Sequence, residues 1–159
     1  MKRGYIFPGQ GSQSVGMGRV LAEEFGAARD VFAAVDDALD QKLSQLMWDG
    51  PESELTLTEN AQPALMAVSM AVLRVLAENG IKLSDDAAYV AGHSLGEYSA
   101  LTGTGALELA DAARLLKLRG QAMQRAVPVG VGAMAALLGL EFEAVVEVAE
   151  QAEQGGEIC

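Results

Sequence analysis

A serine in this chain stands in a setting typical of a catalytic nucleophile. Residues 92–96 read Gly-His-Ser-Leu-Gly, follow the apolar residues 89–91 and precede helix-forming residues. This order of strand, turn and helix is the one that a nucleophile elbow requires. The hydroxyl of Ser94 would point above the sheet, and the amide of Leu95, at the start of the helix, would face a developing oxyanion. The pattern predicts acyl transfer through an acyl-serine.

The same residues allow a plainer interpretation. Ser94 and Glu97 also fit the Ser-x-x-Glu pattern of a capping box, which only starts a helix. Gly-x-Ser-x-Gly also arises by chance in a chain with 18 glycines. From this stretch alone, both interpretations stay open.

An alternation of strands and helices is predicted to position this serine. Residues 4–7 and 89–91 each predict a short buried strand, and Pro8 ends the first. Residues 60–63, Asn-Ala-Gln-Pro, predict the start of a helix that Asn79-Gly80 ends. A further helical segment covers residues 107–127. The expected core faces of the helices are Val31, Phe32, Val35 and Leu39, then Leu65, Val68, Val72, Leu73 and Leu76, then Leu109, Ala112, Ala113, Leu115 and Leu116. Met66 and Met70 are expected to fill the core. The order predicts an α/β fold with a parallel sheet and crossover helices.

Composition excludes several classes of function. The net charge is −11, with 22 acidic against 11 basic residues and no basic cluster, so neither a nucleic-acid site nor an anionic membrane surface is expected. The apolar stretch at the N-terminus is too short for a signal peptide, and no apolar run approaches the length of a membrane span. The single cysteine, Cys159, excludes an intrachain disulfide and suits a reducing cytoplasm.

The glycine-rich residues 8–18 need their own explanation. They lack the Gly-Lys-Ser/Thr ending of a P-loop, and Ser14 stands where a dinucleotide fingerprint needs its third glycine. A surface turn is therefore the simpler interpretation than a nucleotide site. At the other end, residues 127–132 predict a linker. The apolar residues 133–140, a helix carrying Phe142, Val145, Val146 and Ala149, and a Gly155-Gly156 turn predict the beginning of a βαβ unit.

Five separated blocks together resemble the malonyl-CoA:acyl carrier protein transacylases. In order and spacing the match covers the whole chain, and the blocks are residues 7–13 (Phe-Pro-Gly-Gln-Gly-Ser-Gln), 62–65 (Gln-Pro-Ala-Leu), 92–98 (Gly-His-Ser-Leu-Gly-Glu-Tyr), 119–124 (Arg-Gly-Gln-Ala-Met-Gln) and 132–136 (Gly-Ala-Met-Ala-Ala). The resemblance implies an α/β-hydrolase-like large subdomain over residues 1–127. It also implies the incomplete start of a small ferredoxin-like subdomain over residues 128–159.

The resemblance also implies a role for individual residues. Ser94 matches the nucleophile, and the backbone amides of Gln10 and Leu95 match the oxyanion hole. Arg119 matches the arginine that pairs with the malonyl carboxylate, a task that suits the planar fork of a guanidinium. Gln62 matches a residue that lines the site. His93 is expected to support the elbow and not to act as the base, which the family carries on a later segment.

The expected reaction is transfer of malonyl from coenzyme A to the phosphopantetheine thiol of acyl carrier protein in fatty-acid synthesis. The coenzyme A thioester is the substrate, and no permanently bound cofactor or metal is expected. Because the 159 residues hold one histidine, the base is expected in a downstream C-terminal half, and this chain alone is expected to be inactive. The alternatives are a serine hydrolase or thioesterase, an acyltransferase domain of a polyketide synthase, and a non-catalytic half that binds carrier protein.

Overall fold

The computed structural model describes residues 2–128, 130–132 and 135–153. The chain divides into two compact units, Met1–Val127 and Pro128–Cys159. In the first unit, strands β1 (Arg3–Phe7) and β2 (Ala87–Gly92) pair in parallel, with Gly4 opposite Tyr89 and Phe7 opposite Gly92. The prediction of an α/β fold with a parallel sheet is therefore confirmed.

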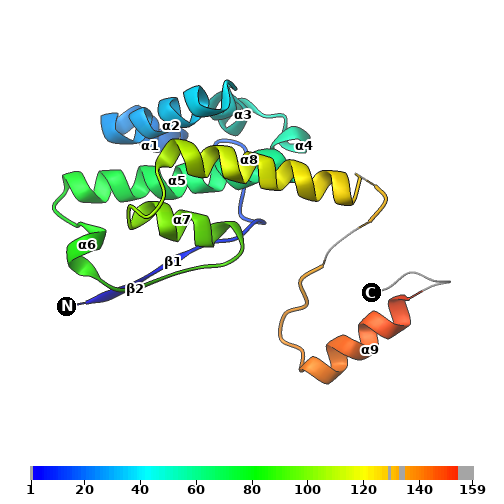
Figure 1. Ribbon diagram of the computed structural model, residues 1–159. Helices are drawn as coiled ribbons and strands as arrows, with labels where there is room; N and C mark the ends of the chain where they lie inside the picture. Colours follow the sequence, from blue (N-terminus) through cyan, green and yellow to red (C-terminus); the bar gives the residue numbers. More distant parts are fainter. Residues whose placement is uncertain (1, 129, 133–134, 154–159) are drawn as a thin grey trace. The chain divides into compact units, whose positions relative to one another are not determined.

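Eight helices of the first unit lie between or after these strands. They are α1 (Arg19–Glu24), α2 (Gly26–Leu39), α3 (Leu43–Asp49), α4 (Glu52–Leu55), α5 (Thr58–Glu78), α6 (Leu83–Asp86), α7 (Leu95–Gly103) and α8 (Leu109–Ala126). Helix α7 lies between the sheet and the pair α5 and α8, and α2 packs on the far side of that pair (Figure 1). The layers place the start of α7, the start of α5 and the second half of α8 around one end of the sheet.

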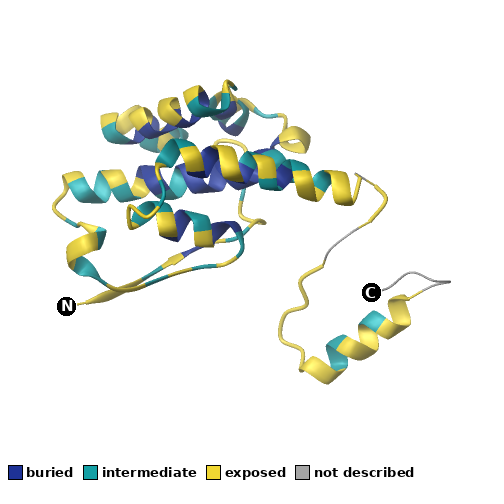
Figure 2. Cartoon of the chain, viewed as in Figure 1, coloured by how far each residue is buried: buried dark blue, intermediate teal, exposed yellow. Residues whose placement is uncertain are grey.

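The core forms where α5 packs against α2, α7 and α8 (Figure 2). Val31, Phe32 and Val35 on α2 are buried, as are Met66 and Met70, which confirms their predicted place in the core. Val72 and Leu115 were predicted to face the core but are 41% and 43% exposed. Ala112, Ala113 and Leu116 on α8 are buried, as predicted. On α5 the buried residues include four alanines that the sequence did not single out, Ala61, Ala64, Ala67 and Ala71.

Helix α5 begins earlier than the sequence predicted. It starts at Thr58, five residues before Pro63, because the amides of Asn60 and Ala61 donate to the carbonyl of Leu57 at 2.8 and 2.9 Å and complete a first turn. Pro63 lies inside the helix, where it removes one hydrogen bond. The predicted stop is confirmed, since Asn79 caps the helix and Gly80 has a φ of +82°.

Helix α5 is also long and apolar enough to cross a membrane, with 56% of that stretch buried in the protein. The expectation that no segment reaches this length was wrong, because it counted uninterrupted apolar residues, whereas this helix includes Gln62 and Arg74 among its apolar residues. Length and composition alone do not distinguish a membrane span from the central helix of a core. The packing of α5 against three other helices accounts for its apolar composition.

The two strands are less buried than predicted. Phe7 is buried, but Ile6 and Tyr89 are 83% and 80% exposed. Successive side chains of a strand point to opposite faces, and the register places Gly4, Ile6, Tyr89 and Ala91 on the same face. Helix α7 covers the other face. Half of each strand is therefore exposed, where the sequence predicted burial.

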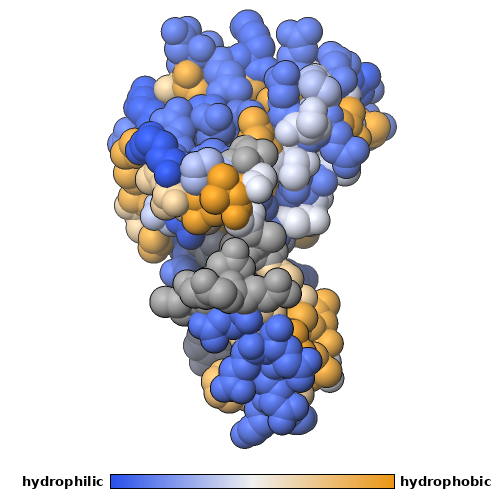
Figure 3. Space-filling model, turned by 90° about the vertical axis from the view of Figure 1, so that its right-hand side faces the viewer, coloured by the Kyte–Doolittle hydropathy of each residue, from blue (hydrophilic) through white to orange (hydrophobic). Residues whose placement is uncertain are grey.

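The second unit contains helix α9 (Phe142–Ala152), whose apolar and acidic residues lie on different sides (Figure 3). Residues 135–140 form no strand in the part of the chain that the structure describes, which contradicts the predicted βαβ start there. A strand needs a neighbouring strand to satisfy its backbone groups, and none is described for this segment. Ala133 and Met134 of the fifth block, the Gly155-Gly156 turn and Cys159 lie outside the described residues. The assignment of this unit to a ferredoxin-like subdomain stays a prediction.

Candidate active site

The backbone at Ser94 has the strained geometry of a nucleophile elbow. Ser94 has φ 57° and ψ −113°, a positive φ that side-chain-bearing residues rarely adopt. It lies between β2 and α7. A Cβ at Gly92 would overlap the backbone of Gly96 and Glu97, and a Cβ at Gly96 would overlap the carbonyls of Phe7 and Pro8. Both positions therefore require glycine.

The hydroxyl of Ser94 does not cap the helix that follows it. Ser94 occupies the N-cap position of α7 without a side-chain capping bond, so the capping-box interpretation is wrong. Instead Ser94 Oγ accepts a hydrogen bond of 3.0 Å from Nη2 of Arg119, on α8. The strained backbone thus directs the hydroxyl toward another helix, whereas a capping serine would bond to an amide of its own helix.

Arg119 has three neighbours in the site. Besides its bond to Ser94, it donates from Nη1 to Oε1 of Gln62 at 2.6 Å, and its guanidinium carbon lies 5.9 Å from the centre of the Tyr98 ring. The ring is within the range of a cation–π interaction. No carboxylate pairs with Arg119 among the residues that the structure describes. Its charge is therefore available to a ligand that carries a carboxylate.

Gln62 links the arginine to the start of α5. Its side chain is 1% exposed, and a buried amide is costly unless its groups are hydrogen-bonded. Nε2 donates to Oγ1 of Thr58 at 2.8 Å and to the sulfur of Met123 at 3.4 Å, while Oε1 accepts from Arg119. The amide is thus held on both sides.

The loop after β1 joins the same network. Thr58 Oγ1 donates to Oε1 of Gln10 at 2.8 Å, and the amide of His93 donates to the carbonyl of Phe7 at 3.2 Å, which holds this loop against the elbow. The amides of Gln10 and Leu95 donate no hydrogen bond within the described ranges. Leu95 is the first residue of α7, so its amide lies at the positive end of the helix. Both amides are available to an oxyanion.

Close packing fixes α8 to the start of α5. A Cβ at Gly120 would overlap the backbone of Glu59 and Thr58, so this glycine allows the two helices to touch, and close packing explains its presence within a helix. Lys117 adds bonds across the same junction, to Glu59 at 3.2 Å and to Asn60 at 2.9 Å. These contacts place Arg119, which lies between Lys117 and Gly120 in sequence, next to Gln62.

His93 does not contact the hydroxyl of Ser94 by a hydrogen bond in the described part of the chain. Its ring lies against Gly9, where a Cβ would overlap Nδ1. The imidazole thus contacts the loop that carries Gln10, which supports a packing role. That role stays a prediction.

The structure brings together Ser94, Gln62, Arg119 and Gln10, and places Leu95 at the helix start beside Ser94. Sequence reasoning did not single out Thr58 or Tyr98. Tyr98 was part of the elbow block, four residues after Ser94. Thr58 lies one helical turn before Gln62, and this spacing becomes informative only once α5 is known to begin at Thr58.

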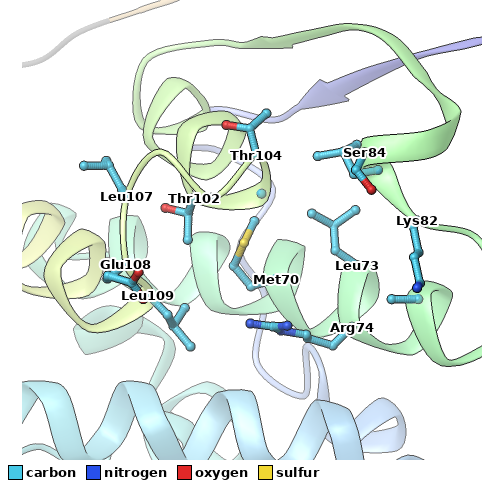
Figure 4. Close-up of a pocket in the computed structure, with 14 residues that line it drawn as sticks. Met70, Leu73, Arg74, Lys82, Ser84, Thr102, Thr104, Leu107, Glu108 and Leu109 are labelled. Atoms are coloured by element: carbon cyan, nitrogen blue, oxygen red, sulfur yellow. The ribbon is translucent and has the colours of Figure 1, made fainter.

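A separate cleft of about 510 Å³ lies near the other end of α5 (Figure 4). Its lining includes Met70, Leu73, Arg74, Lys82 and Thr102 but none of the residues predicted for the site. The hydroxyls of Thr102 and Thr104 donate to backbone carbonyls and that of Ser84 to Asp85 at 3.0 Å, and none of the three has the strained backbone of Ser94. The chemistry therefore points to the Ser94 region and not to this cleft.

The arrangement around Ser94 combines a nucleophile, two amides and a guanidinium that pairs with no carboxylate, as far as the described residues show. It suits attack on an acyl group whose other end carries a carboxylate. No group of three or more His, Cys, Asp or Glu residues that could hold a metal ion occurs in residues 2–128, 130–132 and 135–153.

Comparison with known proteins agrees with this chemistry. Residues 4–153 match the acyl transferase domain family. The malonyl CoA-acyl carrier protein transacylase of Bacillus subtilis strain 168 is 48% identical over 157 residues, which are 99% of this chain and 48% of the relative. The resemblance predicted from the five blocks is thereby confirmed.

Solved structures give the same result. The acyl-carrier-protein S-malonyltransferase of Bartonella henselae superposes with a TM-score of 0.88 at 58% identity, over 95% of this chain and 48% of that one. A malonyl transacylase in complex with a type II PKS acyl carrier protein has a TM-score of 0.86 at 44% identity, over 95% and 48%. The chain spans about half the length of the relatives that it matches. It belongs to the acyl transferase domain family.

Proposed function

We propose that this chain is the nucleophile-bearing half of an enzyme that transfers malonyl from coenzyme A to the phosphopantetheine thiol of acyl carrier protein. Ser94 is the nucleophile, the amides of Gln10 and Leu95 form the oxyanion hole, and Arg119, held by Gln62, binds the malonyl carboxylate. The coenzyme A thioester is a substrate, with no permanently bound cofactor. Fatty-acid or polyketide synthesis in the cytoplasm is the setting that this reaction suits.

The observation that carries the proposal is the 3.0 Å bond between Arg119 and Ser94. In malonyl thioesters a single methylene separates the carboxylate from the carbon that the serine attacks. A guanidinium in direct reach of the serine therefore suits a short acyl group with a terminal carboxylate. A serine hydrolase that acts on neutral esters would have no use for this cation beside its nucleophile.

The reaction has two steps, acylation of Ser94 and transfer of the acyl group to the phosphopantetheine thiol. Ser94 Oγ bonds to the thioester carbon, and the resulting oxyanion accepts hydrogen bonds from Gln10 and Leu95. The C–S bond then breaks, and coenzyme A leaves as the thiol with the proton that the serine gives up. In the second step the phosphopantetheine sulfur attacks the malonyl-serine, its C–O bond breaks, and Ser94 regains a proton.

A general base must carry that proton, and the 159 residues contain only His93 as an imidazole. Since the chain spans about half of its relatives, we propose that the base lies on a further C-terminal half. Carrier protein is proposed as the acceptor because one similar structure is a complex with an acyl carrier protein. Neither nucleic acid nor membrane is a proposed partner, in keeping with a net charge of −11.

The covalent intermediate gives the direct test. A full-length chimera joins residues 1–159 to the half of the Bacillus subtilis relative that this chain does not cover. Incubation with malonyl-CoA should add one malonyl group to Ser94, and Ser94→Ala should abolish the adduct, as read by mass spectrometry of the digested protein. Ser99→Ala, a buried serine on the same helix, should still be labelled. An adduct elsewhere, or labelling of Ser94→Ala, would exclude the mechanism.

Residues 1–159 alone should not turn over. An unactivated serine is a weak nucleophile, and removing the base of a Ser-His pair costs about 10⁴-fold or more in rate. The isolated chain, purified and confirmed by mass, should therefore transfer malonyl at least about 10⁴-fold more slowly than the chimera. Adding the missing half as a second chain should restore activity. Near-normal turnover by residues 1–159 would assign the base to His93 or to another group of this chain.

A further inference from the structure

We propose that Thr58 is a positioning residue of this site, whose hydroxyl holds the Gln62 amide that contacts Arg119 and anchors the side chain of Gln10. The proposal deepens the proposed function and rests on it, because the role concerns how Arg119 is held for a malonyl carboxylate. Thr58 makes no hydrogen bond to Ser94 in the part of the chain that the structure describes.

The first step of the argument is the polarity of the arginine. A guanidinium can only donate hydrogen bonds, so Gln62 must turn its carbonyl oxygen, and not its NH2, toward Arg119. The 2.6 Å bond from Arg119 Nη1 to Gln62 Oε1 has this direction. The NH2 of Gln62 must then point the other way, where it needs an acceptor because the side chain is 1% exposed.

Thr58 supplies the oxygen acceptor, beside the weaker acceptor sulfur of Met123 at 3.4 Å. Its hydroxyl has one hydrogen to donate and lone pairs to accept, and it accepts from Gln62 Nε2 at 2.8 Å. The hydrogen is thereby left for Gln10 Oε1, also at 2.8 Å. One hydroxyl thus orients the amide that holds Arg119 and anchors the side chain of the residue whose amide faces the oxyanion.

The position of Thr58 itself is fixed by backbone contacts. It is the first residue of α5, after an N-cap, Leu57, that makes no side-chain capping bond. The hydrogen bonds of the Thr58 hydroxyl go to the side chains of Gln10 and Gln62 and to no backbone amide among the described residues, so the hydroxyl is not used to start the helix. A Cβ at Gly120 would lie 2.8 Å from the Thr58 carbonyl carbon, so α8 rests directly on this residue. The hydroxyl and Arg119 are held at a constant separation because they come from two helices in contact.

Three variants of the full-length chimera test the role. Thr58→Val keeps the branched shape but removes the hydroxyl, and Thr58→Ser keeps the hydroxyl. Thr56→Val makes the same exchange at an exposed threonine two residues earlier, whose hydroxyl makes no hydrogen bond within the described residues. Circular dichroism and thermal midpoints establish that each variant folds.

The decisive measurement is kcat/KM for malonyl-CoA divided by kcat/KM for acetyl-CoA. Loss of one hydrogen bond of this kind corresponds to about a 3- to 10-fold effect, so Thr58→Val should lower this ratio by about 3- to 10-fold. Thr58→Ser and Thr56→Val should stay within about twofold of the parent. A structural defect would lower kcat/KM for both donors alike and leave their ratio unchanged. An unchanged ratio in Thr58→Val, or an equal fall in Thr56→Val, would overturn the proposal.

A crystal structure of the Thr58→Val chimera gives a result that does not depend on malonyl transfer. Without the hydroxyl, the Gln62 amide should rotate, and Arg119 should move out of hydrogen-bond distance of Ser94 Oγ. An Arg119–Ser94 bond kept at 3.0 Å, with Gln62 unmoved, would contradict the positioning role. If the parent chimera formed no malonyl-serine, the proposed function would fail, while this structural comparison would still decide the role of Thr58.

Discussion

The nucleophile and the arginine of this site are positioned in different ways. The elbow at Ser94 is built from backbone, through a φ of 57° and two glycines that leave no room for a Cβ. Arg119 is held through side chains: it donates to Ser94 and to Gln62, Gln62 donates to Thr58, and Thr58 donates to Gln10. Both regions converge on one oxygen atom, Ser94 Oγ.

This difference suggests a division of labour. The backbone turn at Ser94 has one conformation, and backbone atoms lie next to its two glycines. Because backbone atoms cannot rotate away as a side chain can, a change at one glycine disturbs the whole turn. A side-chain network can lose one member and still leave the nucleophile in place. We therefore expect changes in the elbow to affect every acyl donor, and changes in the Arg119 network to affect the choice among donors.

The largest effect within this comparison is expected from Gly96→Ala in the full-length chimera. The new Cβ would overlap the carbonyls of Phe7 and Pro8 and push away the loop that carries Gln10. Loss of one oxyanion donor costs about 10²- to 10³-fold, so acylation by malonyl-CoA and by acetyl-CoA should both fall by about that factor. The measurement is the rate of acyl-serine formation by rapid-quench mass spectrometry.

Gly4→Ala is the matched control for this variant. Gly4 lies on the exposed face of β1, and a Cβ there would meet nothing within 4 Å. Its acylation rate and its thermal midpoint should match the parent. If Gly96→Ala slowed acylation by malonyl-CoA but not by acetyl-CoA, the view that the elbow serves all donors alike would be contradicted.

Local sequence predicted the elbow well because its causes are local. Glycines two residues either side of Ser94, an apolar strand before it and a helix after it are all visible within ten residues. The parallel pairing of β1 and β2 also followed from the order of elements. The buried face of α2 followed from the spacing of Val31, Phe32 and Val35.

The Arg119 network could not be predicted in the same way, because its causes are distant in sequence. Arg119 lies 25 residues from Ser94 and 57 from Gln62, and only the family resemblance connected them. Thr58 was missed because Pro63 suggested a helix start five residues too late. Val72 and Leu115 were assigned to the core by their spacing, which does not show how wide a face of each helix its neighbours cover.

The next effect in size is expected from Arg119→Ala. A carboxylate that loses its charged partner in a partly buried site is strongly disfavoured. Malonyl transfer by the chimera should lose about 2–4 kcal/mol of transition-state stabilisation, while acetyl transfer holds or rises. The measurement is kcat/KM for both donors. Arg114→Ala is the control, since Arg114 lies on the same helix and pairs with Asp111 at 3.1 Å on the surface. Equal losses for both donors would assign Arg119 to the scaffold.

The smallest effect is expected from Tyr98→Leu, which tests whether the elbow helix also helps to hold the arginine. The Tyr98 ring lies 5.9 Å from the Arg119 guanidinium, and Tyr98 is on α7 whereas Arg119 is on α8. A cation–π interaction in a partly exposed site contributes about 0.5–1 kcal/mol. The variant should therefore lower malonyl kcat/KM by about two- to fivefold and leave acetyl kcat/KM unchanged.

Tyr98→Phe separates the ring from its hydroxyl. It keeps the aromatic face, so its kcat/KM for malonyl-CoA should equal that of the parent chimera. If Tyr98→Leu instead lowered kcat/KM for malonyl-CoA and acetyl-CoA equally, Tyr98 would act through the elbow and would not belong to the Arg119 network. If Tyr98→Leu lowered kcat/KM for malonyl-CoA alone, Tyr98 would belong to the Arg119 network although it lies only four residues after the nucleophile. Proximity in sequence to Ser94 would then not determine which region a side chain serves.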